Sequence, residues 1–314
     1  MKKIPPSLAV IFAALLWSID GFLRQELNTV PSILIVSLEH SIGAIIFLPF
    51  LVKSWKSIKT LGQREWVSIL WIAIFGGILG TFFYTKALGY VNYINLSVVV
   101  LLQKLQPVFA IALSSIILKE KLSNKFISLS LSAIIGAYLV TFGSTLEFEW
   151  NDKTIIASLL ALLSAFCWGS STVLGKHALK SLPFEAVTSL RLTVTAFFTL
   201  VVLFATAEFS MVLELKSVQW QKILIIVFSS GSIALAIYYY GLQNLPASHT
   251  TIYELAWPLS ALLLDWAVRG QLLNATQLIG ALILLVSMIV LSKKASLIIL
   301  TVYLASPPST LTVD

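Results

Sequence analysis

Apolar residues occur in long runs that recur along the whole chain, separated by short polar segments. Each run holds about 18–25 residues, which at about 1.5 Å per residue crosses a hydrocarbon core of about 30 Å. A backbone in lipid must satisfy its hydrogen bonds internally, so runs of this length favour helices. Ten membrane spans are predicted, over residues 7–25, 31–52, 66–88, 95–118, 125–143, 154–176, 184–206, 221–242, 247–268 and 275–292.

The composition indicates a chain with little mass outside the bilayer. Of its 314 residues, 58% are hydrophobic and only 11% are charged, whereas soluble domains carry about 25% charged residues. The single cysteine, Cys167, excludes an intramolecular disulfide and a cysteine-based metal cluster. The net charge of +7 comes from basic residues in short loops rather than on one face, which argues against a nucleic-acid partner. The lipid bilayer and a small-molecule substrate are the expected partners, with no cofactor and no metal.

The distribution of lysine and arginine predicts the orientation in the inner (cytoplasmic) membrane. With the N-terminus inside, thirteen of these residues fall on the cytoplasmic side and five on the opposite side, as the positive-inside rule requires. Both termini are therefore expected in the cytoplasm. The start, Met1-Lys2-Lys3, is interpreted as the entry to an uncleaved first span.

The second half of the chain repeats the pattern of the first. Each half contains five spans, an odd number, so the second half is expected to insert upside down relative to the first. The predicted domains are residues 1–150, residues 151–294 and a tail, 295–314, to which no function is assigned. Such inverted repeats favour alternating access, although repeats also build channels and scaffolds. The matching pairs are Trp17 and Trp168, Pro31 and Pro183, Glu39 and Arg191, Trp66 and Trp220, Tyr84 and Tyr238, and Pro107 and Pro258.

This pattern, together with the entry Lys119-Glu120-Lys121-Leu122 into the fifth span, resembles the drug/metabolite transporter superfamily, specifically the EamA-type transporters. The resemblance covers about residues 7–292. It implies an all-α carrier of ten transmembrane helices in two inverted repeats around a central cavity, often an exporter of amino acids or related metabolites. Arg191 matches the family's usual basic residue in the second span of a half, whereas the first half has Glu39-His40 there.

Charged side chains inside the spans mark the predicted site, because a charge at the bilayer centre costs about 2.5–3.5 kcal/mol. Glu39 and Arg191 each lie eight residues inside a proline, about 12 Å deep, and are expected to approach each other near the midplane. Arg24 is expected to extend to the outer interface. Lys104 is expected to bind a substrate carboxylate or to pair with Glu39, and Glu254 to receive an amine.

Ten residues are predicted to line the substrate site: Trp17, Asp20, Glu39, Gln103, Lys104, Gln106, Arg191, Tyr239, Glu254 and Trp257. Glu39, His40 and Glu254 are the candidates for proton coupling, because a carboxylate can be neutralised and an imidazole titrates near neutral pH. Packing roles stay open, with Asp20 in a local ion pair and His40 in an interhelical hydrogen bond. Pro107 and Pro258 are expected to kink the fourth and ninth spans.

The sequence therefore predicts a secondary active transporter that moves an amino acid or a related zwitterion or amine, in the export direction, coupled to protons or exchange. A channel-like uniporter is the alternative. An intramembrane enzyme is a distant third, because Glu39-His40 has no second histidine at helical spacing. Substrate identity and oligomeric state stay open.

Overall fold

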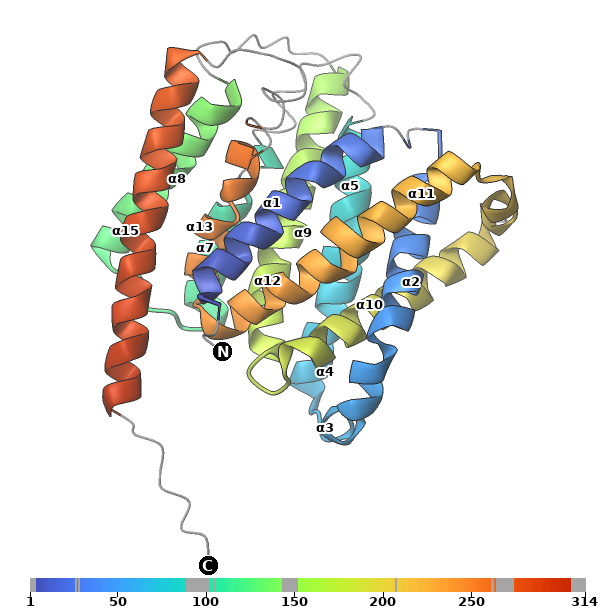
Figure 1. Ribbon diagram of the computed structural model, residues 1–314, viewed down its shortest axis with the longest axis horizontal. Coiled ribbons are helices and arrows are strands. Elements are labelled where there is room, and N and C mark those ends of the chain that lie inside the picture. The colour runs from blue at the N-terminus through green and yellow to red at the C-terminus, as the bar shows by residue number, and fades with distance from the viewer. Residues whose placement is uncertain are drawn as a thin grey trace, which may run out of the picture.

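The computed structural model is an all-helical bundle and describes residues 4–25, 27, 29–88, 102, 103, 105–142, 152–206, 208–260, 263 and 274–305 (Figure 1). Two segments are π-helical (η1 and η3) and one is a 3₁₀ helix (η2). The elements are α1 (Pro6–Gln25), α2 (Ser32–Lys53), α3 (Trp55–Lys59), α4 (Gln63–Trp71), η1 (Ile72–Leu79), α5 (Gly80–Leu88), α7 (Gln106–Ile117), α8 (Asn124–Phe142), α9 (Asp152–Ala178), α10 (Phe184–Ala205), η2 (Glu208–Glu214), α11 (Ser217–Ile226), η3 (Val227–Gly231), α12 (Ser232–Asn244), α13 (Ala247–Tyr253) and α15 (Ala275–Ala305).

Helices fall within all ten predicted spans, so the all-α membrane architecture is confirmed at that level. Within the described residues, five helical segments are long and apolar enough to cross a membrane: Ser32–Lys53, Gln63–Tyr84, Ile155–Ala178, Phe184–Ala205 and Ser217–Asn244. Pro31 and Pro183 have extended backbone, with ψ of 132° and 155°, directly before α2 and α10. A proline there leaves no helical hydrogen bond unmade, which explains why both helices begin where they do.

The two halves pack so that the first helix of each half contacts the third span of the other half. α1 lies against α12 and η3, and its counterpart α9 lies against α5 and η1. The other helices meet their own counterparts: α2 packs on α10, α7 on α13, and α8 on α15. The main core cluster accordingly takes buried side chains from both halves, including Val10, Ile69, Leu192 and Leu242. The halves therefore form one bundle rather than two independent domains.

The π-helical segments η1 and η3 occupy matching positions in the two halves. Gly76 in η1 and Ser230 in η3 each lie ten residues after the tryptophan that begins the third span, Trp66 or Trp220. A π-helical turn holds one residue more than an α-helical turn and is frequent at functional sites. Both segments lie where helices of the opposite half cross.

α8 and α15 form a pair at one side of the bundle (Figure 1). Gly136 and Gly280 face each other there, because a Cβ on Gly136 would stand 2.9 Å from the Gly280 carbonyl oxygen. Close backbone contact through small residues is typical of helix pairs in membranes. α15 also continues to Ala305, beyond the predicted end at residue 292, because residues 292–305 contain no proline or glycine to end the helix.

Candidate functional site

Glu254 is the centre of a polar cluster that three helices build in the apolar bundle. Its carboxylate accepts hydrogen bonds from Gln106 Nε2 of α7 at 2.6 Å and from the Tyr238 hydroxyl of α12 at 2.8 Å. Thr172 of α9 donates to Glu254 at 3.5 Å and also contacts the Tyr238 hydroxyl at 2.8 Å. Donors from separate helices thus hold one carboxylate, which is an arrangement suited to ligand recognition.

A break in the helix positions Glu254. α13 ends at Tyr253, and helical backbone resumes at Ala256. Pro258 lies four residues after Glu254 and has no N–H to donate to the Glu254 carbonyl. Trp257 N donates to that carbonyl instead, at 3.0 Å. The break thus falls beside Pro258, where a kink was predicted.

Two adjacent tyrosines connect this cluster to a basic residue. The Tyr238 ring lies 5.2 Å from Trp17 and 5.6 Å from Tyr239, centroid to centroid. Arg191 donates from Nη1 to the Tyr239 hydroxyl at 2.9 Å, with its guanidinium 5.8 Å from the Tyr239 ring centre. An acidic and a basic residue are therefore joined by aromatic side chains.

A second charged cluster joins α1, α2 and η3. Arg24 Nε lies 2.5 Å from Asp20 Oδ2, and Arg24 Nη2 lies 2.6 Å from Glu39 Oε2. The Ser230 hydroxyl donates to Asp20 at 2.7 Å. The expectation that Arg24 extends to the outer interface is wrong, because two carboxylates hold its guanidinium inside the bundle. Asp20 forms the local ion pair that was left open for it.

The predicted approach of Glu39 to Arg191 is wrong as a direct contact. The two ion pairs within the described residues both belong to Arg24, and Arg191 donates to Tyr239 instead. Arg24 reaches Glu39 first because Asp20, four residues earlier on the same helix face, directs its side chain there. His40 is buried, and its Nδ1 lies 2.9 Å from the Val36 carbonyl oxygen of its own helix, whereas the packing role left open for it was an interhelical bond.

The remaining predicted residues belong to the fourth and ninth spans. Gln103 is buried and donates to Gln106 at 3.3 Å. Pro107 stands in the first turn of α7, which follows a turn at Leu105 and helical backbone at residues 102 and 103. The fourth span is therefore broken beside its proline, as the ninth span is beside Pro258. Trp257 packs edge-on against Tyr84, with ring centroids 6.4 Å apart. Lys104 lies outside the described residues.

The structure adds polar residues that sequence reasoning missed. Tyr238, Thr172 and Ser230 contact the predicted site, although only Tyr239 was singled out among the consecutive tyrosines. Matching interactions recur in the other half. The Trp17 indole donates to the Ser230 carbonyl at 2.9 Å, and the Trp168 indole donates to the Gly76 carbonyl at 3.3 Å. The match between Trp17 and Trp168 was the available signal for these contacts.

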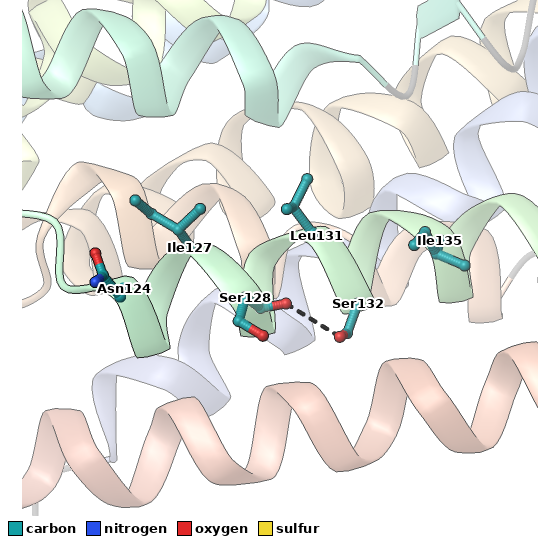
Figure 2. Close-up of a pocket in the computed structure, with 6 residues that line it drawn as sticks. All are labelled: Asn124, Ile127, Ser128, Leu131, Ser132 and Ile135. Carbon is teal, nitrogen blue, oxygen red and sulfur yellow. Dashed lines mark hydrogen bonds between the residues drawn. The ribbon is translucent and has the colours of Figure 1, made fainter.

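A groove of about 380 Å³ lies elsewhere, along one face of α8 (Figure 2). Ile127, Leu131 and Ile135 line it and are 42%, 56% and 54% exposed, so it opens on the outside of the bundle. No predicted site residue borders this groove. The central cavity between the halves stays a prediction.

Comparisons with known proteins give consistent matches over the whole helical region. The model of the EamA-like transporter family matches twice, over residues 5–142 and 155–293. The riboflavin transporter ImpX of Fusobacterium nucleatum is 37% identical over 295 residues, covering 93% of this chain and 99% of that protein. Protein LicB of Haemophilus influenzae is 25% identical over 289 residues, covering 89% and 94%. A crystal structure at 18% identity has the same fold, with a TM-score of 0.72 over 93% of this chain and 98% of that chain.

Proposed function

Because the chain belongs to the EamA-like transporter family, and is thus a multi-pass membrane transporter and not an enzyme, we propose that it carries riboflavin or a closely related flavin by alternating access. The proposal rests on one observation above all: Tyr238 and Tyr239 join the Glu254 carboxylate at one end to the Arg191 guanidinium at the other. A flat aromatic ring with polar edges matches such a lining, since apolar walls with a few placed polar groups are typical of ligand sites.

The relative named as a riboflavin transporter supports this choice of cargo, at 37% identity over nearly its full length. A flavin combines an aromatic ring system with hydrogen-bonding edges and a hydroxylated side chain. The second candidate is the amino acid or amine predicted from the sequence. It is favoured by the presence of both a carboxylate, Glu254, and a guanidinium, Arg191, in one connected cluster of side chains. The same uptake assay separates the two.

The transport cycle we propose uses ten membrane helices in two halves, residues 1–150 and 151–294, with the second half inverted. The exchange of partners between α1–α12 and α9–α5 supports this repeat. Inverted repeats provide two alternative packings of similar energy around a central site. Glu39, His40 and Glu254 remain the candidates for proton coupling, and a facilitative uniporter without coupling is the alternative mechanism.

Purified protein in proteoliposomes is expected to take up labelled riboflavin against its gradient when a pH gradient is imposed. We expect Glu39→Gln to keep exchange of riboflavin but to lose accumulation, because this variant has no titratable carboxyl at residue 39. Glu214→Gln, the same chemical change at an exposed position, serves as the matched control. Amino acids and amines are tested in parallel.

Accumulation of an amino acid, with no riboflavin uptake, would reject the flavin proposal in favour of the second candidate. Riboflavin equilibration that is indifferent to the pH gradient, in wild type and Glu39→Gln alike, would support the uniporter.

We further propose that both termini face the cytoplasm of the cell. Two variants test this orientation, Glu214→Cys and Lys56→Cys, each combined with Cys167→Ser. The Glu214→Cys variant is expected to react in intact cells with a membrane-impermeant maleimide, and the Lys56→Cys variant only after the cells are opened. Both positions are exposed, so access to reagent decides the result. The opposite labelling pattern would reverse the orientation.

A further inference from the structure

Arg191 has a buried donor atom that the described part of the chain leaves without a partner. Its Nη1 is bonded to Tyr239, whereas its Nε is buried and has no hydrogen-bond partner within the described part of the chain. No carboxylate oxygen of a described residue lies within 4.0 Å of this guanidinium, since the ion pairs found there involve Arg24 alone. The Nε and Nη2 atoms together form the side of a guanidinium that binds two acceptor atoms at once.

Ser171 supplies a second unused polar group beside it. The Ser171 hydroxyl is buried and also has no hydrogen-bond partner among the described residues. Ser171 and Arg191 meet at Gly76, because a Cβ there would collide with Ser171 Oγ and stand 3.2 Å from Arg191 Nη2. The absence of a side chain at residue 76 thus lets Ser171 Oγ and Arg191 Nη2 approach the same point. Orphaned buried polar groups are costly, so a bound partner would stabilise them.

At the matching position around Asp20, the protein's own side chains satisfy one another's hydrogen bonds. There, Asp20 accepts from Ser230 and from Arg24, and Arg24 also binds Glu39. At the symmetry-related position, which takes residues from both halves, the counterparts at the same spacing lack both carboxylates. They are Ser171 for Asp20, Gly76 for Ser230, Gly175 for Arg24 and Arg191 for Glu39. The Tyr239 ring packs against Gly175, 3.2 Å from its Cβ position, where the first half has a cation.

We propose that Arg191 and Ser171 form the subsite that binds the edge of the substrate carrying two neighbouring acceptor atoms. This deepens and rests on the proposed flavin transport. In a flavin, N1 with the C2 carbonyl oxygen and N5 with the C4 carbonyl oxygen each form an edge of two neighbouring acceptor atoms. Such a pair matches the Nε–Nη2 edge of a guanidinium, as a carboxylate does. Glu254, at the other end of the tyrosine pair, then receives the donor groups of the same ligand.

The experiment measures equilibrium binding of riboflavin, 1-deazariboflavin and 5-deazariboflavin to purified wild type, Arg191→Gln, Arg191→Lys and Ser171→Ala. Each analogue replaces one of the two ring nitrogens by C–H. We expect Arg191→Gln to weaken riboflavin binding at least about 10-fold, and Arg191→Lys to weaken it also, because a lysine loses the two-pronged geometry. Ser171→Ala should weaken it about 3-fold or more.

The binding of the two analogues identifies which edge of the flavin Arg191 contacts. The informative analogue is the one that lacks the ring nitrogen bonded to Arg191. It should bind wild type about 10-fold more weakly than riboflavin and lose less than about 3-fold further in Arg191→Gln. Ser158→Ala is the matched control, since Ser158 lies on the same helix with an equally unpartnered hydroxyl, and it should bind riboflavin as wild type does.

Equal losses for riboflavin and both analogues in Arg191→Gln, or unchanged binding in that variant, would overturn the subsite while leaving flavin transport intact. If Arg191→Gln does not fold, the Ser171→Ala comparison decides by the same criterion. Wild type that binds no riboflavin would reject the proposed function, and the subsite with it.

Discussion

Replacing Arg24 by glutamine is expected to lower the free energy of unfolding by about 3 kcal/mol, the lower end of the range for a broken buried ion pair. The variant leaves Asp20 and Glu39 facing each other inside the bundle with no cation between them. The lower end applies because the Arg24 and Asp20 side chains are 23% and 21% exposed. Thermal unfolding in detergent should show a fall in Tm of about 6 °C or more.

Two comparisons make the Arg24 result specific. The triple variant Asp20→Asn/Arg24→Gln/Glu39→Gln removes all three charges and is expected to be more stable than Arg24→Gln alone, because it leaves no uncompensated carboxylate. Arg64→Gln makes the same substitution at an exposed position of α4 and should change stability by less than about 0.5 kcal/mol. A triple variant no more stable than Arg24→Gln would show that packing, rather than charge, stabilises this cluster.

The largest functional loss is expected from Glu254→Gln, with riboflavin uptake reduced about 10- to 100-fold, as the loss of a charge-assisted hydrogen bond predicts. The carboxylate accepts from both Gln106 and Tyr238. A glutamine amide has one oxygen and one NH₂ group and no charge, so it cannot accept from both donors as the carboxylate does unless one of them reverses its hydrogen bond. The measurement is the initial uptake rate per amount of reconstituted protein, with Glu214→Gln as the control.

A swapped pair of residues tests the reason for that loss. In Glu254→Gln/Gln106→Glu, the amide at residue 254 donates to the new carboxylate and still accepts from Tyr238. We therefore expect part of the uptake to return. Wild-type uptake in Glu254→Gln would show that this carboxylate only packs the bundle, whereas no recovery in the double variant would show that a negative charge is required at residue 254 itself.

The helices were predictable because long apolar runs dictate them, and the positions of Glu254 and Pro258 were predictable from single residues. The pairing of the charged residues could not be predicted. Glu39 lies fifteen residues from Arg24, and their contact depends on how α1 and α2 cross, which no local pattern encodes. Thr172, Ser171 and Ser230 were missed because hydroxyls in membrane helices commonly bond their own backbone and carry no distinct signal.

The two π-helical segments also indicate the order of two steps in the evolution of the chain, the insertion of a residue and the duplication of the five-helix unit. Each adds a residue to the third helix of its half, and each presents a carbonyl to a tryptophan indole of the other half. Deleting one residue would rotate everything beyond it by about 100°, so such an insertion survives only where the packing uses it. If the insertions were independent, both would have had to occur at the same turn of the third helix in the two halves. One insertion in an ancestral five-helix unit, copied when that unit was doubled, accounts for both.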